Sequence, residues 1–197
     1  MSTTACIEPA VYTGQTLEKN GYTLCTAQDI PFTPTEWARL EFLTDEENLS
    51  YSKAQVGDTN ESLSMGFFRI KKPGELKILH EELMQIIASP KMLNFYREIC
   101  QNNKLWIDRC QAHLYKTNDF IARHVDKESY QGYLYSLLFA ISQDFLGGEM
   151  VLYNNKGTVD TFKLPYRSLL LADSAIPHEV LPVKSGVRKT LAFFLME

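Results

Sequence analysis

Four residues in the C-terminal half of the chain have types and spacing that suit metal chemistry. His124 and Asp126 are separated by one residue, His178 follows 52 residues after the aspartate, and Arg188 follows ten residues later. Two imidazoles and one carboxylate can occupy one face of Fe(II) and leave the opposite face open. A nearby arginine could bind a carboxylate through its planar, permanently charged fork. The four residues therefore predict a metal centre beside a carboxylate site, provided that the fold brings them together.

Each part of this pattern is weak alone, and the order of the parts makes it specific. A histidine and an aspartate one residue apart recur by chance, and His178 or Arg188 alone could be structural. Here a Gly-Gly-Glu turn at 147–149 opens a strand, and an apolar strand at 169–174 ends just before His178. On the last strand Arg188 and Thr190 share a face, so a guanidinium and a hydroxyl point into the same space.

The elements that must position these residues change in character along the chain. The first half predicts a short extended segment at 21–30, and a helix from Thr33 or Thr35 through Leu43. Residues 44–65 indicate a long polar loop of the kind that can act as a lid. Residues 73–101 have apolar residues at helical spacing and are divided at Pro90.

Short apolar runs separated by turn residues follow from residue 104 onward. They predict strands at 106–116, 133–141, 149–153, 158–164, 168–172 and 187–195. Helices followed by strands favour a mainly β (α+β) fold, an antiparallel sandwich or barrel with helices packed on one face. We expect one domain over residues 1–197, with helical support at about 32–101 and a β core at about 104–196.

The strand from Leu105 to Lys116 has an unusually polar face. Alternation places Arg109, Gln111, His113 and Tyr115 on one side. Such a face is either exposed to solvent or lines a polar cavity, and alternation alone leaves both readings open. The short distance in sequence to His124 favours the cavity.

Composition narrows the class of protein. The chain has 197 residues, 45% apolar and 22% charged, with a net charge of −4, so there is no electrostatic sign of nucleic-acid binding at the level of the whole chain. Its four cysteines form no CxxC pair, which indicates reduced, mostly buried thiols. There is no secretory signal pattern and no apolar run long enough to span a bilayer. We expect a cytoplasmic protein with no membrane partner.

The stretch from about Trp106 to Phe194 resembles the catalytic core of the Fe(II)/2-oxoglutarate-dependent oxygenases, and looks closest to the prolyl 4-hydroxylase-like branch. The matching pieces are Tyr115, the loop 118–126 (NDFIARHVD), the turn 147–149 (GGE) and the block 177–188 (PHEVLPVKSGVR). One departure is Asn118, where the family often has glycine. Asparagine tolerates the left-handed backbone region better than most residues, so we expect the loop to keep its shape.

The resemblance implies a fold, a site and a set of cofactors. The fold would be a double-stranded β-helix (jelly-roll) core with the N-terminal helices packed on the major sheet. The cofactors would be Fe(II), 2-oxoglutarate as cosubstrate and dioxygen, with ascorbate as a stimulant. His124, Asp126 and His178 would be the iron ligands, and Arg188, Tyr115 and Thr190 would bind the distal carboxylate of 2-oxoglutarate.

The same resemblance implies a reaction, and it leaves the substrate open. The reaction would hydroxylate an unactivated C–H bond while 2-oxoglutarate is decarboxylated to succinate and carbon dioxide. Related halogenating enzymes have Gly or Ala in place of the carboxylate ligand, so Asp126 favours hydroxylation. A protein side chain such as prolyl is the first candidate substrate, and a free amino acid or other small metabolite is the alternative. The candidate substrate contacts are Arg109, Gln111, His113 and Tyr135, with Tyr133 and the loop 44–65 as further candidates.

Three other functions compete with this interpretation. Nucleic-acid demethylases of this chemistry typically carry a second arginine six residues after the cosubstrate arginine, and here that position is Phe194. An oxygenase that does not use 2-oxoglutarate would not need Tyr115, Arg188 and Thr190. A catalytically inactive jelly-roll binding module would not need an intact ligand set. The sequence does not assign the oligomeric state.

Overall fold

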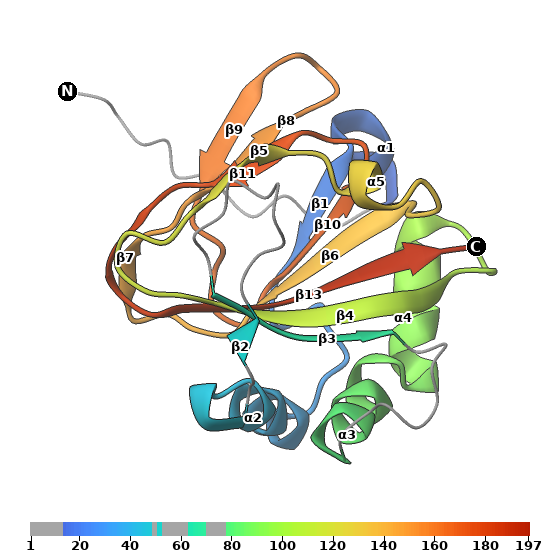
Figure 1. Cartoon of the computed structure of the whole chain (residues 1–197). Coiled ribbons are helices and arrows are strands. Elements are labelled where there is room, and N and C mark those ends of the chain that lie inside the picture. The colour runs from blue at the N-terminus through green and yellow to red at the C-terminus, as the bar shows by residue number, and fades with distance from the viewer. Residues whose placement is uncertain (1–13, 49–50, 53–62, 70–77) are drawn as a thin grey trace.

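Antiparallel β-sheet dominates the protein, as the sequence predicts. The computed structural model describes residues 14–48, 51–52, 63–69 and 78–197 (Figure 1). The major sheet has the strand order β1 (Tyr22–Cys25), β10 (Leu169–Asp173), β6 (Tyr135–Ala140), β13 (Arg188–Met196), β4 (Trp106–Tyr115), β3 (Leu63–Arg69) and β2 (Tyr51–Ser52).

Two smaller sheets complete the β structure of the described residues. The minor sheet has the order β5 (Ile121–His124), β11 (His178–Val180), β8 (Met150–Tyr153) and β9 (Val159–Phe162). A two-stranded sheet pairs β12 (Val183–Gly186) with β7 (Phe145–Gly147). In Figure 1 the minor sheet lies above one face of the major sheet, and residues of both sheets line one cavity.

Helices cover the opposite face of the major sheet. They are α2 (Pro34–Leu43), α3 (Ile78–Ile87) and α4 (Pro90–Cys100), while α1 (Gly14–Asn20) precedes β1, the 3-10 turn η1 (Glu46–Asn48) follows α2, and α5 (Asp126–Ser129) follows β5 (Figure 1). A capping box starts α2, in which the Thr33 side chain accepts a hydrogen bond from the backbone of Glu36 and the Glu36 side chain accepts one from the backbone of Thr33. Trp37 of α2 then packs edge-on against Phe139 of β6, with ring centres 5.7 Å apart.

Alternation along β13 separates the supporting core from the space between the sheets. Leu191, Phe193 and Leu195 are fully buried in the core that the sheet shares with the helices. Each such side chain contributes on the order of 2 kcal/mol by its removal from water. Arg188, Ala192 and Phe194 point to the other face of the sheet and line the cavity there.

β1 lies within the extended segment predicted at 21–30, and the structure corrects the prediction that the remaining strands all follow residue 104. Three strands from the N-terminal part, β1, β2 and β3, join the major sheet, and β3 pairs directly with β4. The predicted loop at 44–65 therefore contains β2 and the start of β3, because backbone pairing with β4 outweighs the polar local sequence. The rest of that segment, 49–50 and 53–62, lies outside the described residues, as do residues 70–77 at the predicted start of α3.

The structure also tests the predictions for the cysteines and for the backbone at Asn118. Cys25, Cys100 and Cys110 are free and buried, as predicted, while Cys6 lies outside the described residues. Asn118 adopts the left-handed conformation with φ 75°, which explains why asparagine can replace glycine there. No helix in the described ranges is long and apolar enough to cross a membrane.

Candidate active site

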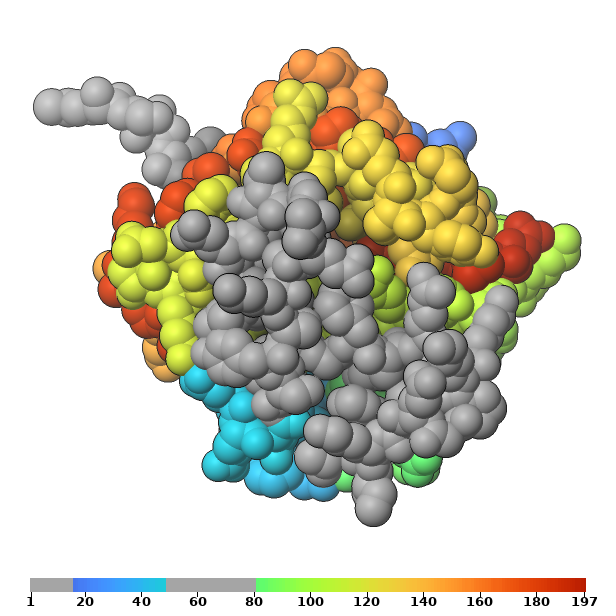
Figure 2. Space-filling view, in the orientation of Figure 1, coloured from blue at the N-terminus to red at the C-terminus, as the bar shows by residue number. Residues whose placement is uncertain are grey.

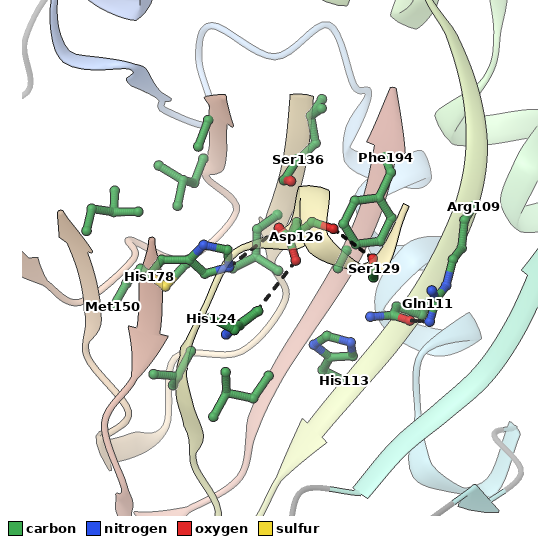
Figure 3. Close-up of a pocket in the computed structure, with 18 of the residues that line it drawn as sticks. Arg109, Gln111, His113, His124, Asp126, Ser129, Ser136, Met150, His178 and Phe194 are labelled. Atoms are coloured by element: carbon green, nitrogen blue, oxygen red, sulfur yellow. Dashed lines mark hydrogen bonds and ion pairs between the residues drawn. The ribbon is translucent and has the colours of Figure 1, made fainter. Parts of the chain in front are cut away.

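His124, Asp126 and His178 come together in the space between the two sheets. His124 ends β5, Asp126 begins α5 two residues later, and His178 begins β11, which pairs with β5 so that the two histidines are register partners. Nε2 of His124 lies 3.5 Å from Oδ1 of Asp126, and Nε2 of His178 lies 3.5 Å from Oδ2 (Figure 3). One ligand atom from each residue lies within 4.8 Å of the others, so one cation could contact all three.

Backbone carbonyls fix both imidazole rings in the orientation that a metal requires. Nδ1 of His124 lies 2.8 Å from the carbonyl oxygen of Ala122, and Nδ1 of His178 lies 3.0 Å from that of Ile176. A carbonyl oxygen can only accept a hydrogen bond, so Nδ1 carries the proton in each neutral ring. Each Nε2 then directs its lone pair toward Asp126, which is the tautomer that binds a metal.

The electrostatics of the cluster favour the charge states of a metal site. Burial alone would raise the pKa of Asp126, but its interactions with His178, His124 and Ser136 lower it to about 2. Burial lowers the pKa of His178, and His124 adds to the effect while Asp126 opposes it. Asp126 is therefore an anion near neutral pH and His178 is neutral, which are the forms that coordinate a divalent cation.

Arg188 lies at another part of the same cavity and is 2% exposed. Its Nη1 donates a long hydrogen bond of 3.4 Å to Oγ1 of Thr190, and its guanidinium carbon is 5.3 Å from the centre of the Tyr115 ring. Its buried Nη2 has no hydrogen-bond partner among the described residues. A buried guanidinium with an unmatched donor is costly unless an anion completes it.

Gly148 provides the room that Arg188 needs. This glycine has φ 66°, and a Cβ atom placed on it would lie 2.9 Å from Cδ of Arg188. The Gly-Gly-Glu turn therefore packs its backbone against the arginine stem, which a larger residue would displace. The sequence singled out this turn as part of the pattern, and the structure gives the contact that explains it.

The cavity joins these groups to the polar face of β4. It has a volume of about 180 Å³ and is lined by Arg109, Gln111, His113 and Tyr115 together with the three clustered residues and Arg188. Alternation left open whether this face met solvent, and the structure directs it into the cavity. Apolar side chains form much of the remaining wall: Ile121, Leu138, Met150, Leu152, Val180 and Phe194.

Three predicted residues stand apart from this cavity. Thr190 does not line it directly and reaches it only through Arg188. Tyr135 lines a different hollow, next to α1 and the end of α4, because it points to the opposite face of β6 from Ser136. Tyr133 is fully buried and stacks on Phe194, so it supports the wall of the cavity without lining it.

A family comparison identifies the fold that holds this site. Residues 110–196 match the model of the 2OG-Fe(II) oxygenase superfamily. This matched region, somewhat under half of the chain, is similar to that superfamily. Proteins of that superfamily are oxygenases that use Fe(II) and 2-oxoglutarate, and the matched region contains all three clustered residues and Arg188. No curated protein matches the sequence significantly.

Solved structures show that the fold of the whole chain is that of these oxygenases. A 2OG-Fe(II) oxygenase family oxidoreductase from Burkholderia pseudomallei aligns with 98% of this chain and 91% of its own, at 21% identity and a TM-score of 0.78. A prolyl-4-hydroxylase from Pseudomonas putida aligns with 94% of this chain and 97% of its own, at 18% identity and a TM-score of 0.66. The α-ketoglutarate-dependent epimerase SnoN from nogalamycin biosynthesis aligns with 93% and 79%, at 10% identity and a TM-score of 0.69. These matches confirm the expected jelly-roll fold.

The residues at this site fit both Fe(II) and 2-oxoglutarate, the two groups that the matching family model names or implies. Two unprotonated Nε2 atoms and an ionised carboxylate within 4.8 Å of one another form a donor set suited to Fe(II). The unmatched Nη2 of Arg188 is a donor suited to a carboxylate, and 2-oxoglutarate has one at each end.

Sequence reasoning missed Ser136. Its hydroxyl hydrogen-bonds to Asp126 and helps to lower the pKa of that carboxyl, and it lies 2.9 Å from the hydroxyl of Ser174. The available signal was a small polar residue within the apolar run at 133–141. Its role depends on the pairing of β6 with β13, which local sequence does not reveal.

Proposed function

We propose that this protein is an Fe(II)- and 2-oxoglutarate-dependent dioxygenase that hydroxylates an unactivated C–H bond. His124, Asp126 and His178 would bind the iron, and Arg188, with Tyr115 beside it, would bind the distal carboxylate of 2-oxoglutarate. The observation that carries the proposal is the buried Arg188, whose Nη2 has no partner among the described residues and which lines the same cavity as the three clustered residues.

Each side chain has a defined task in this reaction. When bound with dioxygen, Fe(II) and 2-oxoglutarate supply the oxidising power that couples decarboxylation of 2-oxoglutarate to succinate and carbon dioxide with hydroxylation of the substrate. His124 and His178 hold their Nε2 atoms in place through their Nδ1 hydrogen bonds, and Asp126 supplies the negative charge. Arg188 orients the cosubstrate through a rigid, charged fork.

The apolar part of the cavity wall excludes water from the site. Leu138, Met150 and Leu152 line the cavity, and Leu152 is fully buried. A dry site strengthens every charge interaction within it and limits side reactions. Asp126 fills the carboxylate position that halogenating relatives leave empty, which supports hydroxylation as the outcome.

Two substrate classes are consistent with the comparisons. The likeness to a prolyl-4-hydroxylase supports a prolyl side chain in a protein, which is the first candidate from the sequence. The likeness to an epimerase of nogalamycin biosynthesis shows that the fold also serves an enzyme of small-molecule biosynthesis. The polar groups of β4 bear on the choice between these two classes.

The test is release of succinate by the purified full chain loaded with Fe(II). We expect 2-oxoglutarate to bind only when Arg188 is intact and Fe(II) to bind with one ion per chain. Retention of 2-oxoglutarate binding by Arg188→Ala would overturn the cosubstrate assignment. Failure of the chain to bind Fe(II) would overturn the metal assignment.

A further inference from the structure

Arg109 and Gln111 form a second polar region in the cavity, away from the one around Arg188. Both lie on β4, and six residues of strand separate Arg109 from Tyr115, which corresponds to about 20 Å. Figure 3 shows both side chains on the far side of His113 from His124. Arg109 and Arg188 therefore line the same cavity as the three clustered residues, at positions that lie six residues apart along the paired strands β4 and β13.

The contact between the two side chains fixes which atoms face a ligand. Nη2 of Arg109 donates a hydrogen bond of 2.8 Å to Oε1 of Gln111. The amide oxygen is therefore occupied, and the amide NH₂ is directed away from Arg109 into the cavity (Figure 3). A guanidinium and an amide NH₂ offer donors only, so the region selects a group that offers acceptors and negative charge.

The surroundings hold this pair in place. Phe194 is the register partner of Arg109, and the guanidinium carbon lies 5.9 Å from the centre of its ring. Phe194 in turn stacks on the buried Tyr133 with ring centres 4.6 Å apart and the planes 16° from parallel. Ala192 is opposite Gln111, and its small side chain leaves room for a ligand at the amide.

His113 adds no positive charge to this region near neutral pH. Burial, followed by the positive charge of Arg188, lowers the pKa of His113 to about 3, so its ring is neutral near pH 7. The positive charge of the described residues on this face of β4 therefore comes from Arg109. A neutral ring between the two arginines also reduces repulsion along the strand.

We propose that the substrate carries a free carboxylate, which Arg109 and Gln111 bind while Fe(II) and 2-oxoglutarate occupy the other end of the cavity. The inference rests on the proposed function, because it assigns the substrate class of that same site. A small carboxylic acid, such as a free amino acid, satisfies these donors. A prolyl residue inside a peptide does not, since its own carboxyl group is a neutral amide.

The test measures succinate release by the Fe(II)-loaded full chain at saturating 2-oxoglutarate. The probes are the free L-amino acids, the matching carboxamides, and a prolyl peptide blocked at both ends. We expect at least one acid to stimulate turnover about tenfold more than its carboxamide, because a charged hydrogen bond is lost in the amide. Equal stimulation by acids and amides, stimulation by the blocked peptide alone, or no stimulation by any acid would overturn the proposal.

Variants assign the effect to the two residues. Arg109→Met should raise KM for the stimulating acid about tenfold or more while kcat and 2-oxoglutarate affinity stay within about twofold. Gln111→Glu preserves the shape and the contact with Arg109 but neutralises its charge, so it should raise KM in the same way even if Arg109→Met folds poorly. Arg39→Met is the matched control, because Arg39 pairs with Glu82 on the helical side of the molecule.

The outcomes separate this inference from the proposed function. An unchanged KM for the acid in both cavity variants would overturn the inference and leave the function standing. Loss of Fe(II) and 2-oxoglutarate binding in the unmodified chain would overturn the function itself.

Discussion

At the scale of single residues, the site depends on buried charged side chains whose protein neighbours leave them available to bind a ligand. Asp126 is ionised between two imidazoles, and Arg188 is buried with an unmatched donor. In both cases the protein holds a charge in a place where water cannot stabilise it well. Such an arrangement persists when a ligand completes it, which is why these two residues carry the sharpest predictions.

Asp126→Ala should abolish the metal site without unfolding the protein. Loss of an outer contact to a metal ligand already costs about 10–100-fold in affinity, so we expect a loss of at least about 100-fold for the ligand itself. Fe(II) binding by calorimetry and succinate release both measure the effect. Glu179→Gln is the control, because Glu179 adjoins His178 in sequence but its carboxylate accepts a hydrogen bond from Tyr153 outside the cavity. Normal Fe(II) affinity in Asp126→Ala would contradict the ligand assignment.

Arg188→Met should separate binding from stability. Two charged hydrogen bonds would be lost, so 2-oxoglutarate affinity should fall about 100-fold or more. Burial lowers the pKa of Arg188, which reflects the cost of holding its charge there. The free energy of unfolding without ligand should therefore stay the same or rise by about 1 kcal/mol. Chemical denaturation with and without 2-oxoglutarate measures both effects, and equal stabilisation of variant and unmodified protein by the ligand would refute the prediction.

At the scale of elements, the turn between β7 and β8 links a backbone conformation to a ligand site. Gly148→Ala should cost about 1–2 kcal/mol of stability, since its φ of 66° is strained for alanine. It should also weaken 2-oxoglutarate binding, because the new Cβ would lie 2.9 Å from Cδ of Arg188 and push the stem aside.

A matched glycine separates these two effects. Gly157, between β8 and β9, has φ 75°, and a Cβ atom placed on it would have nothing within 4 Å. Gly157→Ala therefore carries the same strain without the crowding. We expect both variants to lose stability and only Gly148→Ala to lose 2-oxoglutarate affinity. A similar loss of affinity in both would show that strain, not contact with Arg188, is responsible.

The sequence predicts those elements of the fold that have a local pattern of apolar and capping residues, and it misses those that depend on pairing with distant strands. The helix at 34–43 and its cap at Thr33 follow from local pattern, and so do β4 and β13. The short strands β5, β7, β11 and β12 have three or four residues each, too few for alternation to show. β1 and β3 join the major sheet through pairing with β10 and β4, which are distant in sequence.

The same limit applies to the site. Spacing and family resemblance predict His124, Asp126, His178 and Arg188 as site residues. The structure places all four around one cavity. Tyr135 is predicted as a substrate contact, but it faces another hollow. The sequence does not show which alternate residues of β6 face the cavity. Ser136, its neighbour, is the residue that faces the cavity.

At the scale of the whole molecule, the protein has two hydrophobic cores, a larger one that supports the major sheet and a smaller one beside the cavity. The larger core lies between the major sheet and the helices, and it includes Trp37, Tyr96 and Phe193. The smaller one lies between the sheets around Leu152 and Leu170, next to the cavity. In the space-filling view of Figure 2, β8 and β9 (orange) form the top of the molecule, and the segment that contains α2 (cyan) forms the bottom. The large core therefore stabilises a sheet whose other face carries polar and charged side chains, and those side chains make stability depend on pH.

His113 provides the clearest case of this dependence. Its pKa in the folded protein is about 3, lowered from 6.5 by burial first and then by Arg188, Arg109 and His124, against the opposing charge of Asp126. Between pH 6.5 and 3 the unfolded chain binds a proton at this position that the folded chain does not. The contribution of His113 to stability is therefore complete above pH 6.5 and decreases as the pH falls toward 3.

This sign gives a prediction for the metal-free protein. From about pH 7 to about pH 4.5, His113 should account for a loss of roughly 2 kcal/mol in the free energy of unfolding, since each unit of pKa shift corresponds to about 1.4 kcal/mol. His113→Gln, which cannot take up a proton, should lose less stability over the same range. Urea denaturation at several pH values measures the difference between the two proteins. Parallel curves would mean that His113 is as readily protonated in the fold as in the unfolded chain, and that the polar face of β4 is open to water.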